Sequence, residues 1–278
     1  MLKLLGTRVL GTRERDAVLR ALDADPVAGC MIAARVQQRG IGRSALGGEL
    51  WTRGGAERAL CFSGGNLVPL AGTRHDIEAF ADRALRGPRL CTSLVGRSEL
   101  TMPMWTLLES RWGPAREVRP DQPLLALDAE PAVKPDALVR RVTMDDLAPY
   151  LEAAIAMFIE EVGIDPRLHD GGQGYRERVA ATIRAGRAWA RIADGRVLFK
   201  AEVGSYSDRV GQIQGVWVRP GERARGLGTR GTATLCAELR AAGRTPSLYV
   251  NSFNAPARAS YARIGFRQVA TFSTVLID

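Results

Sequence analysis

The stretch "RARGLGTRGTA", residues 223–233, contains three glycines that fit two different phosphate-binding loops. Gly226, Gly228 and Gly231 spell G-x-G-x-x-G, the pattern of a turn that holds the pyrophosphate of a dinucleotide. Together with Arg223, the first two of these glycines also spell R-x-x-G-x-G, the pattern of a loop that holds an acyl-coenzyme A. The residues around the loop decide between the two interpretations, and with them the fold.

The surroundings of the loop argue against a dinucleotide. Such a loop opens a repeated strand-helix-strand unit, and an Asp or Glu about 20 residues later binds the ribose. The next strand candidate, "SLYVNSFN" (247–254), has no acidic residue, and only about fifty residues follow the loop, too few for a doubly wound sheet. A nucleotide P-loop is excluded because no G-K-[ST] follows.

The acyl-coenzyme A interpretation explains more of the neighbouring sequence. The strand candidate "GVWVRP" (215–220) leads into the loop, and a helix is predicted after it, through about Ala242. Backbone N–H groups of a glycine loop and the positive end of a helix both attract a pyrophosphate. Downstream, residues 254–266 have the spacing N-x-x-A-x-x-x-Y-x-x-x-G-F.

With these motifs, residues 139–278 resemble the GNAT superfamily of acetyl-CoA-dependent N-acetyltransferases. The whole chain is also similar to actinobacterial GNAT proteins with a degenerate GNAT-like amino-terminal region. The resemblance implies an α/β fold of the α+β kind: a mixed, mostly antiparallel sheet with helices on both faces, splayed between its two central strands where the cofactor enters. The motif is matched at Arg223, Gly226, Gly228, Asn254, Tyr261, Gly265 and Phe266.

The chain divides into two halves of similar predicted element order, which suggests a tandem of one fold. The Pro-rich stretch 119–136 separates them, its prolines break regular structure, and a linker is expected near 129–138. We therefore expect a degenerate GNAT-like domain over 1–128 and a catalytic domain over 139–278. The latter is predicted to run strand, two helices, three strands, helix, strand, helix, and to end in two strands, "FRQVATF" and "STVLI".

The resemblance also implies a cofactor site in the second half. The strand before the loop would pair with the pantetheine arm and place the acetyl carbonyl, and the loop backbone would wrap the pyrophosphate. Asn254 would lie beside the pantetheine, and Tyr261 near the thioester sulfur, where it would protonate the departing thiolate. The strand positions are Val216, Trp217 and Val218, and the loop positions are Arg223, Ala224, Arg225, Gly226, Leu227, Gly228 and Thr229.

The general base is less clear from the sequence. Many GNAT enzymes carry a glutamate on the strand before the loop, but the matching position here is Gln212, whose amide cannot accept a proton. Glu202 on the neighbouring strand is the first substitute, followed by Glu160 and Glu161 at the end of the first helix. His169 has an ordinary pKa suited to proton transfer, and its loop suggests a role in substrate access.

Composition restricts the partners. The net charge of +9 favours anionic ligands, and arginines spread along the chain, without a zinc-finger, basic-zipper or RNP-type motif, argue against nucleic acid as the main partner. Four scattered cysteines predict reduced core thiols, with no metal site and no disulfide scaffold. No apolar run reaches the roughly 20 residues of a membrane span, and the start turns charged too early for a secretory signal, so we expect a cytoplasmic monomer or homodimer.

Two functions follow from these observations. The first is an N-acetyltransferase that moves an acetyl group from acetyl-CoA to a primary amine of a small molecule or a protein. The second is a non-catalytic acyl-CoA-binding module that regulates or scaffolds a partner, an interpretation favoured by Gln212 and by the degenerate first half.

Overall fold

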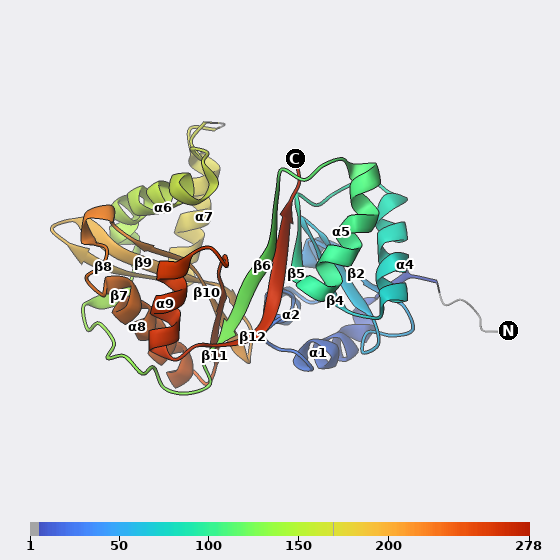
Figure 1. Cartoon of the computed structure of the whole chain (residues 1–278), viewed down its shortest axis with the longest axis horizontal. Coiled ribbons are helices and arrows are strands. Elements are labelled where there is room, and N and C mark those ends of the chain that lie inside the picture. The colour runs from blue at the N-terminus through green and yellow to red at the C-terminus, as the bar shows by residue number, and fades with distance from the viewer. Residues whose placement is uncertain (1–5, 169) are drawn as a thin grey trace.

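The computed structural model describes residues 6–168 and 170–278, so that residues 1–5 and His169, with its predicted role, lie outside the described part. In these residues the strands form one twelve-stranded sheet with the order β1-β2-β3-β4-β5-β12-β6-β11-β10-β9-β8-β7. Helices cover both faces of the sheet (Figure 1). Among the residues described here, no helix has the length and apolar character needed to cross a membrane.

The two halves repeat the same order of elements: a strand, helices, three strands, a helix, a strand, a helix and a last strand. This confirms the predicted mixed sheet with a tandem arrangement. The first half contains β1 (Arg8–Val9), α1 (Arg15–Asp23), α2 (Cys30–Arg39), α3 (Arg43–Leu46), β2 (Gly48–Thr52), β3 (Leu60–Gly64), β4 (Asn66–Ala71), α4 (Arg74–Leu85), β5 (Ser93–Arg97), α5 (Ser98–Trp112) and β6 (Glu117–Ala126). The second half contains β7 (Val139–Arg141), α6 (Leu147–Val162), α7 (Gln173–Arg184), β8 (Ala188–Ala193), β9 (Arg196–Tyr206), β10 (Val210–Val218), α8 (Leu227–Ala241), β11 (Thr245–Tyr249), α9 (Ala255–Ile264) and β12 (Arg267–Leu276).

The halves exchange their last strands. β12 ends the second half but lies antiparallel between β5 and β6, and β6 ends the first half but lies antiparallel between β12 and β11. Figure 1 shows β6 and β12 side by side in the middle of the molecule, between the two groups of helices. Each half therefore completes its sheet with a strand from the other half.

Two expectations about these strands were wrong. The chain ends in one strand, β12, and not in two, because residues 267–276 pair continuously with β6 apart from two bulges. Pro120 and Pro123 do not break regular structure but lie within β6. The second of the two bulges lies opposite Pro120, whose carbonyl accepts hydrogen bonds from the hydroxyls of Ser98 and Ser273 at 3.2 and 2.7 Å.

The sheet opens between one parallel pair of strands in each half. β4 and β5 pair only through Asn66 and Leu67, and β10 and β11 pair only from Val210 to Gln212. Beyond these rungs the strands separate, as the predicted splay requires. In the second half the opening follows Gln212, the position where the sequence lacks the expected glutamate.

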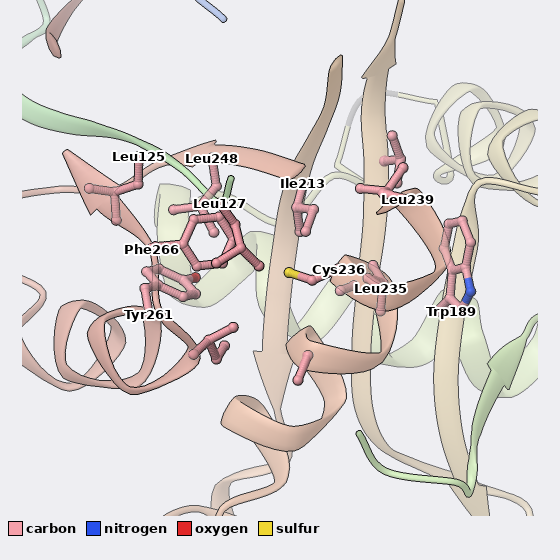
Figure 2. Close-up of a cluster of buried hydrophobic side chains, with 14 of the residues drawn as sticks. Leu125, Leu127, Trp189, Ile213, Leu235, Cys236, Leu239, Leu248, Tyr261 and Phe266 are labelled. Atoms are coloured by element: carbon pink, nitrogen blue, oxygen red, sulfur yellow. The ribbon is translucent and has the colours of Figure 1, made fainter. Parts of the chain in front are cut away.

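Separate apolar clusters hold helices on the two faces of the second half. The cluster under α8 and α9 extends from Tyr261 and Phe266 to Trp189 (Figure 2). α6 and α7 cover the other face through a cluster that includes Tyr150 and Trp217. The four cysteines, Cys30, Cys61, Cys91 and Cys236, are buried with free thiols.

The strand exchange predicts that the second half depends on β6. We expect a fragment of residues 139–278 to unfold at a lower temperature than a fragment of 114–278, because only the longer one keeps β6 beside β11 and β12. The shorter fragment loses Leu124 and Leu127, which are almost fully buried and contribute about 1.5–3 kcal/mol each. The measurement is thermal unfolding by circular dichroism. Equal midpoints for the two fragments would contradict the dependence.

Candidate functional site

The loop between β10 and α8 presents a helix N-terminus with free donors. Gly226 is the N-cap of α8 with a φ of +78°, and no side chain accepts a hydrogen bond from this end of the helix. The first N–H groups of a helix have no partner within the helix, so those of Leu227, Gly228 and Thr229 remain available. A helix N-terminus of this kind binds phosphate groups.

The three glycines of the loop have different physical roles. Gly226 adopts a left-handed backbone that disfavours other residues. A Cβ at Gly228 would lie 3.3 Å from a methyl of Val218, and a Cβ at Gly231 would lie 2.5 Å from the ring of Phe199. Gly231 thus permits α8 to pack on the sheet and takes no part in the loop. Ala224 also has a positive φ, of +61°, which is uncommon for a residue with a Cβ.

The sheet topology excludes a dinucleotide fold. In the described part of the second half, β10 and β11 form the one parallel pair, and the remaining neighbours are antiparallel. A dinucleotide fold needs a mostly parallel sheet of repeated strand-helix units. The G-x-G-x-x-G match is therefore accidental, since its last glycine reflects helix packing.

The loop arginines are already paired with carboxylates. Arg223 donates to both carboxylate oxygens of Glu160 at 2.6 and 2.7 Å, and also to the carbonyl of Val218. Arg225 forms an ion pair with Glu222 at 2.9 Å. The side chain of Arg223 ties the loop to the end of α6, so the free donors of the site are those of the backbone.

The carboxylates at the end of α6 differ in their surroundings. Glu160 accepts hydrogen bonds from Arg223 and, at 3.2 Å, from the indole of Trp217, and the bond from Arg223 lowers its pKa. Glu161 is accessible to solvent but crowded by protein, and this crowding raises its pKa although Lys200 and Arg119 partly oppose the effect. A raised pKa suits a carboxylate for accepting a proton near neutral pH.

Glu202 lies deeper, on the face of β9 that α6 covers. It is almost fully buried. Its carboxylate packs against Gly215: a Cβ added to this glycine would lie 2.9 Å from the nearer carboxylate oxygen of Glu202. Lys200, two residues earlier on the same face, is fully buried and donates to the carbonyl of Gly215. Gln212 is also buried and occupies the last rung that joins β10 to β11.

Tyr261 and Asn254 lie on α9, on the other side of the opening. Tyr261 is buried in contact with the cluster of Figure 2, its ring 5.9 Å from that of Phe266, and burial raises its pKa so that the phenol keeps its proton. Asn254 caps α9, with its side-chain oxygen accepting from the N–H of Ala257 at 3.2 Å. Val216 and Val218 pack on the α8 side, whereas Trp217 faces α6.

Sequence reasoning missed the bulge in β10 and the lysine beside it. Gln214 pairs with Glu202 and Trp217 pairs with Lys200, so β10 has one residue more than β9 between these rungs. A glycine inside an apolar strand, at position 215, is a sign of a bulge. A lysine inside the apolar strand 196–206 was the corresponding sign of a buried charge.

The N-terminus of α4, unlike that of α8, is capped by its own side chains. α4 begins after Thr73, and the carboxylate of the fully buried Asp76 accepts from the N–H and hydroxyl of Thr73 at 3.0 and 2.7 Å. Arg53 donates to the other oxygen at 2.9 Å. Burial alone would raise the pKa of Asp76, but the bonds from Thr73 and Arg53 outweigh it and lower the pKa.

Two family models match parts of the chain. The family model described as "FR47-like protein" matches residues 201–275. A model described as "Domain of unknown function (DUF4081)" matches residues 48–150 and crosses the predicted boundary between the domains. No curated protein matches the chain.

Solved structures share the fold over nearly the whole chain. A Drosophila protein aligns with a TM-score of 0.69 at 15% identity, over 98% of each chain. A GNAT-family acetyltransferase from Colwellia psychrerythraea aligns with a TM-score of 0.57 at 10% identity, over 98% of this chain and 99% of that one. A GCN5-related N-acetyltransferase from Kribbella flavida gives 0.52 at 17%, over 88% and 95%.

The FR47-like match over residues 201–275 and the shared fold make this chain similar to the GNAT acetyltransferases. The likeness to the solved structures shows the fold of the chain. The division into domains at 128 and 139 and the roles of individual residues stay predictions.

The ion pair of the first half predicts a large effect on stability. Replacing Asp76 by Ala leaves the buried guanidinium of Arg53 without this carboxylate, which should lower the free energy of unfolding by about 3–5 kcal/mol at neutral pH. Because the pKa of Asp76 is lowered in the folded state, this stabilisation is complete above its unfolded pKa of about 3.9 and is lost as pH falls through the folded value.

Urea unfolding at several pH values measures this contribution. Asp82→Ala, on the exposed side of the same helix, is the matched control and should change the free energy of unfolding by no more than about 0.5 kcal/mol. An Asp76 variant as stable as this control would show that the carboxylate does not hold the first half together.

Proposed function

We propose that the protein is an N-acetyltransferase that transfers an acetyl group from acetyl-CoA to a primary amine of a small molecule or a protein. The observation that carries the proposal is the uncapped N-terminus of α8 beside the opening between β10 and β11. The backbone from Arg223 to Thr229 binds the pyrophosphate, and the strand from Val216 to Val218 lies along the pantetheine arm. Asn254 lies on the far side of the arm and keeps its amide nitrogen for it, since its oxygen caps α9.

The reaction is a direct transfer. The nitrogen of a neutral amine attacks the thioester carbonyl, a C–N bond forms, and the C–S bond breaks. The nitrogen loses a proton to a carboxylate base, and Tyr261 donates its phenolic proton to the departing thiolate. Burial raises the pKa of Tyr261, so the phenol holds its proton when the thiolate forms.

We assign the base to Glu161 in place of the missing glutamate at position 212. Glu160 is held by Arg223 and has a lowered pKa, which makes it a weaker base than Glu161. Glu202 is buried against the Gly215 bulge, whereas Glu161 is open to solvent and close enough to Tyr261 to influence its pKa. Glu161 also interacts electrostatically with Arg119 of β6, so the first half contributes to the acceptor side.

A non-catalytic acyl-CoA-binding module is the alternative, and Gln212 favours it. In that case acetyl-CoA would bind in the same opening and would alter the binding of a partner, with no acetyl transfer. Acetyl-CoA binding without release of CoA, for every amine tried, would support this module over the enzyme.

Thermal-shift titration tests the binding site. Acetyl-CoA and CoA should raise the melting temperature of the wild type, and NAD should not, because a ligand of the folded state at 100 times its Kd adds about 2.7 kcal/mol of stability. Gly228→Glu should abolish the rise, since its carboxylate enters the pyrophosphate site and its Cβ crowds Val218.

Gly42→Glu is the matched control for this variant. It adds the same side chain in the first half, where a Cβ meets no atom within 4 Å, and should keep the response to acetyl-CoA. A melting temperature raised by NAD alone would refute the acyl-coenzyme A site.

Activity against pH tests the base. The kcat/KM of the wild type should rise with pH through a group whose pKa lies above the ordinary glutamate value of about 4.3, because Glu161 must be deprotonated to accept a proton. Glu161→Gln should lower kcat about 10²–10⁴-fold. Because the pKa of Glu161 is raised in the folded state, its ionised form destabilises the fold above that pKa. Glu161→Gln should therefore be no less stable than the wild type at neutral pH.

Three further variants separate the candidate residues. Glu152→Gln, on the same helix and exposed, should keep the activity and the pH profile of the wild type. Tyr261→Phe should lower kcat without removing acetyl-CoA binding. Loss of activity in Glu202→Gln, together with a fully active Glu161→Gln, would move the base to Glu202.

A further inference from the structure

A lysine is fully buried beneath the proposed thioester site. Lys200 has no solvent exposure, and its ammonium donates to the carbonyl of Gly215 at 3.1 Å. Its other neighbours are the sulfur of Met157 at 3.3 Å and the ring of Tyr150, whose centre lies 5.4 Å away. Packing alone does not explain an ammonium here, because burial of a charge is unfavourable and an apolar side chain would fill the same space.

The lysine lies at the bulge that interrupts the ladder between β9 and β10. From Gln214 to Trp217, β10 has four residues opposite three of β9, from Lys200 to Glu202. Gly215 has a φ of +59°, a conformation that residues with a Cβ rarely adopt. At this rung the ammonium of Lys200 binds the Gly215 carbonyl.

This hydrogen bond orients one peptide group. A peptide unit is planar and trans, so its C=O and N–H point in opposite directions. With the Gly215 carbonyl directed to Lys200 on the α6 side of β9, the N–H of Val216 is directed away from Lys200. On its edge facing β11, β10 has no strand partner beyond Gln212, because its ladder with β11 has ended.

We propose that Lys200 is a positioning residue for acyl transfer: it anchors the Gly215 carbonyl and thereby aims the Val216 N–H at the carbonyl oxygen of the bound thioester. The inference rests on the proposed function and adds a residue to it. The N–H stabilises the negative charge that develops on this oxygen as the amine attacks, and an aimed donor is effective because it needs no reorganisation. Lys200 touches neither the thioester nor the amine.

The charges around Lys200 fit this role. Burial lowers the pKa of the ammonium, and Glu202 and Glu161 oppose the decrease. Among the described residues no salt bridge joins Lys200 to either glutamate, and the oxygen that accepts its hydrogen bond is the Gly215 carbonyl, at 3.1 Å. The hydrogen bond from a protonated lysine is stronger than one between neutral groups, which keeps the bulge in a single geometry.

The experiment compares the full-length wild type with Lys200→Met, an apolar side chain of similar length. Infrared difference spectra of bound [1-¹³C]acetyl-CoA report the hydrogen bond to the thioester carbonyl, and CoA, which lacks this carbonyl, reports binding of the rest of the molecule. We expect the carbonyl band of the wild type to move to lower wavenumber on binding and most of this shift to disappear in the variant. The Kd for CoA should change less than about threefold, and kcat should fall about 10²–10³-fold, the effect of losing one such donor.

Two more variants complete the test. Lys134→Met, at an exposed lysine of the loop between the halves, should leave the band shift and kcat unchanged. Gly215→Ala disturbs the contact between Lys200 and Gly215 by changing the glycine, because its Cβ would lie 3.1 Å from the Lys200 nitrogen. This variant replaces Lys200→Met in the test if Lys200→Met does not fold. It should reduce the band shift in the same way.

The outcomes separate this inference from the proposed function. A band shift and kcat that persist in folded Lys200→Met would overturn the role of Lys200 while acetyl transfer stands. Equal weakening of acetyl-CoA and CoA binding, with the band shift retained, would show that the lysine only supports the fold. A wild type that binds neither ligand would overturn both proposals.

Discussion

The pairing of β6 with β12 is the interaction on which the rest of the structure depends. Each strand ends one half of the chain and completes the sheet of the other, so that the two halves share a single twelve-stranded sheet. Without β6 and β12, both β5 and β11 would be edge strands. Sheet edges with free backbone groups are prone to pair with other chains, and here each half covers the edge of the other.

The position of the opening between β10 and β11 follows from this pairing. β6 pairs with β11 from Leu124 to Ala126, and the loop after β11 remains bonded to it through the carbonyls of Pro123 and Asp121. β11 therefore stays alongside β6 and diverges from β10, so that the ladder between β10 and β11 ends at Gln212. β10 is left with a free edge beside the helix N-terminus of α8. The bulge at Gly215 lies in the ladder with β9, on the opposite edge of β10.

Much of this architecture could be predicted from the sequence, because periodicity and glycine placement report local structure. The elements of the second half follow the predicted order up to its last strand, and the loop at Gly226 lies where the motif predicts. The exchange of β6 and β12 could not be predicted, since strand patterns do not specify partners. For the same reason Pro120 suggested a break in structure, although a bulge and two serine hydroxyls accommodate it. The ion pair of Arg223 with Glu160 and the bond of Lys200 to Gly215 join residues distant in sequence, and no local pattern reports them.

The two halves differ in how the N-terminus of the equivalent helix is capped. α4 and α8 occupy equivalent places, each after the last of three strands and before a strand parallel to it. At α4 the carboxylate of Asp76 accepts from the backbone N–H of Thr73, and Arg53 neutralises it. At α8 the corresponding region holds Gly226 and Gly228, and its arginines are tied to carboxylates away from the backbone donors. The N-terminus of α4 is thus capped by its own side chains, whereas that of α8 has no side-chain cap and follows Ala224, a residue with a Cβ at positive φ. Residues in such sparsely populated backbone conformations cluster at functional sites.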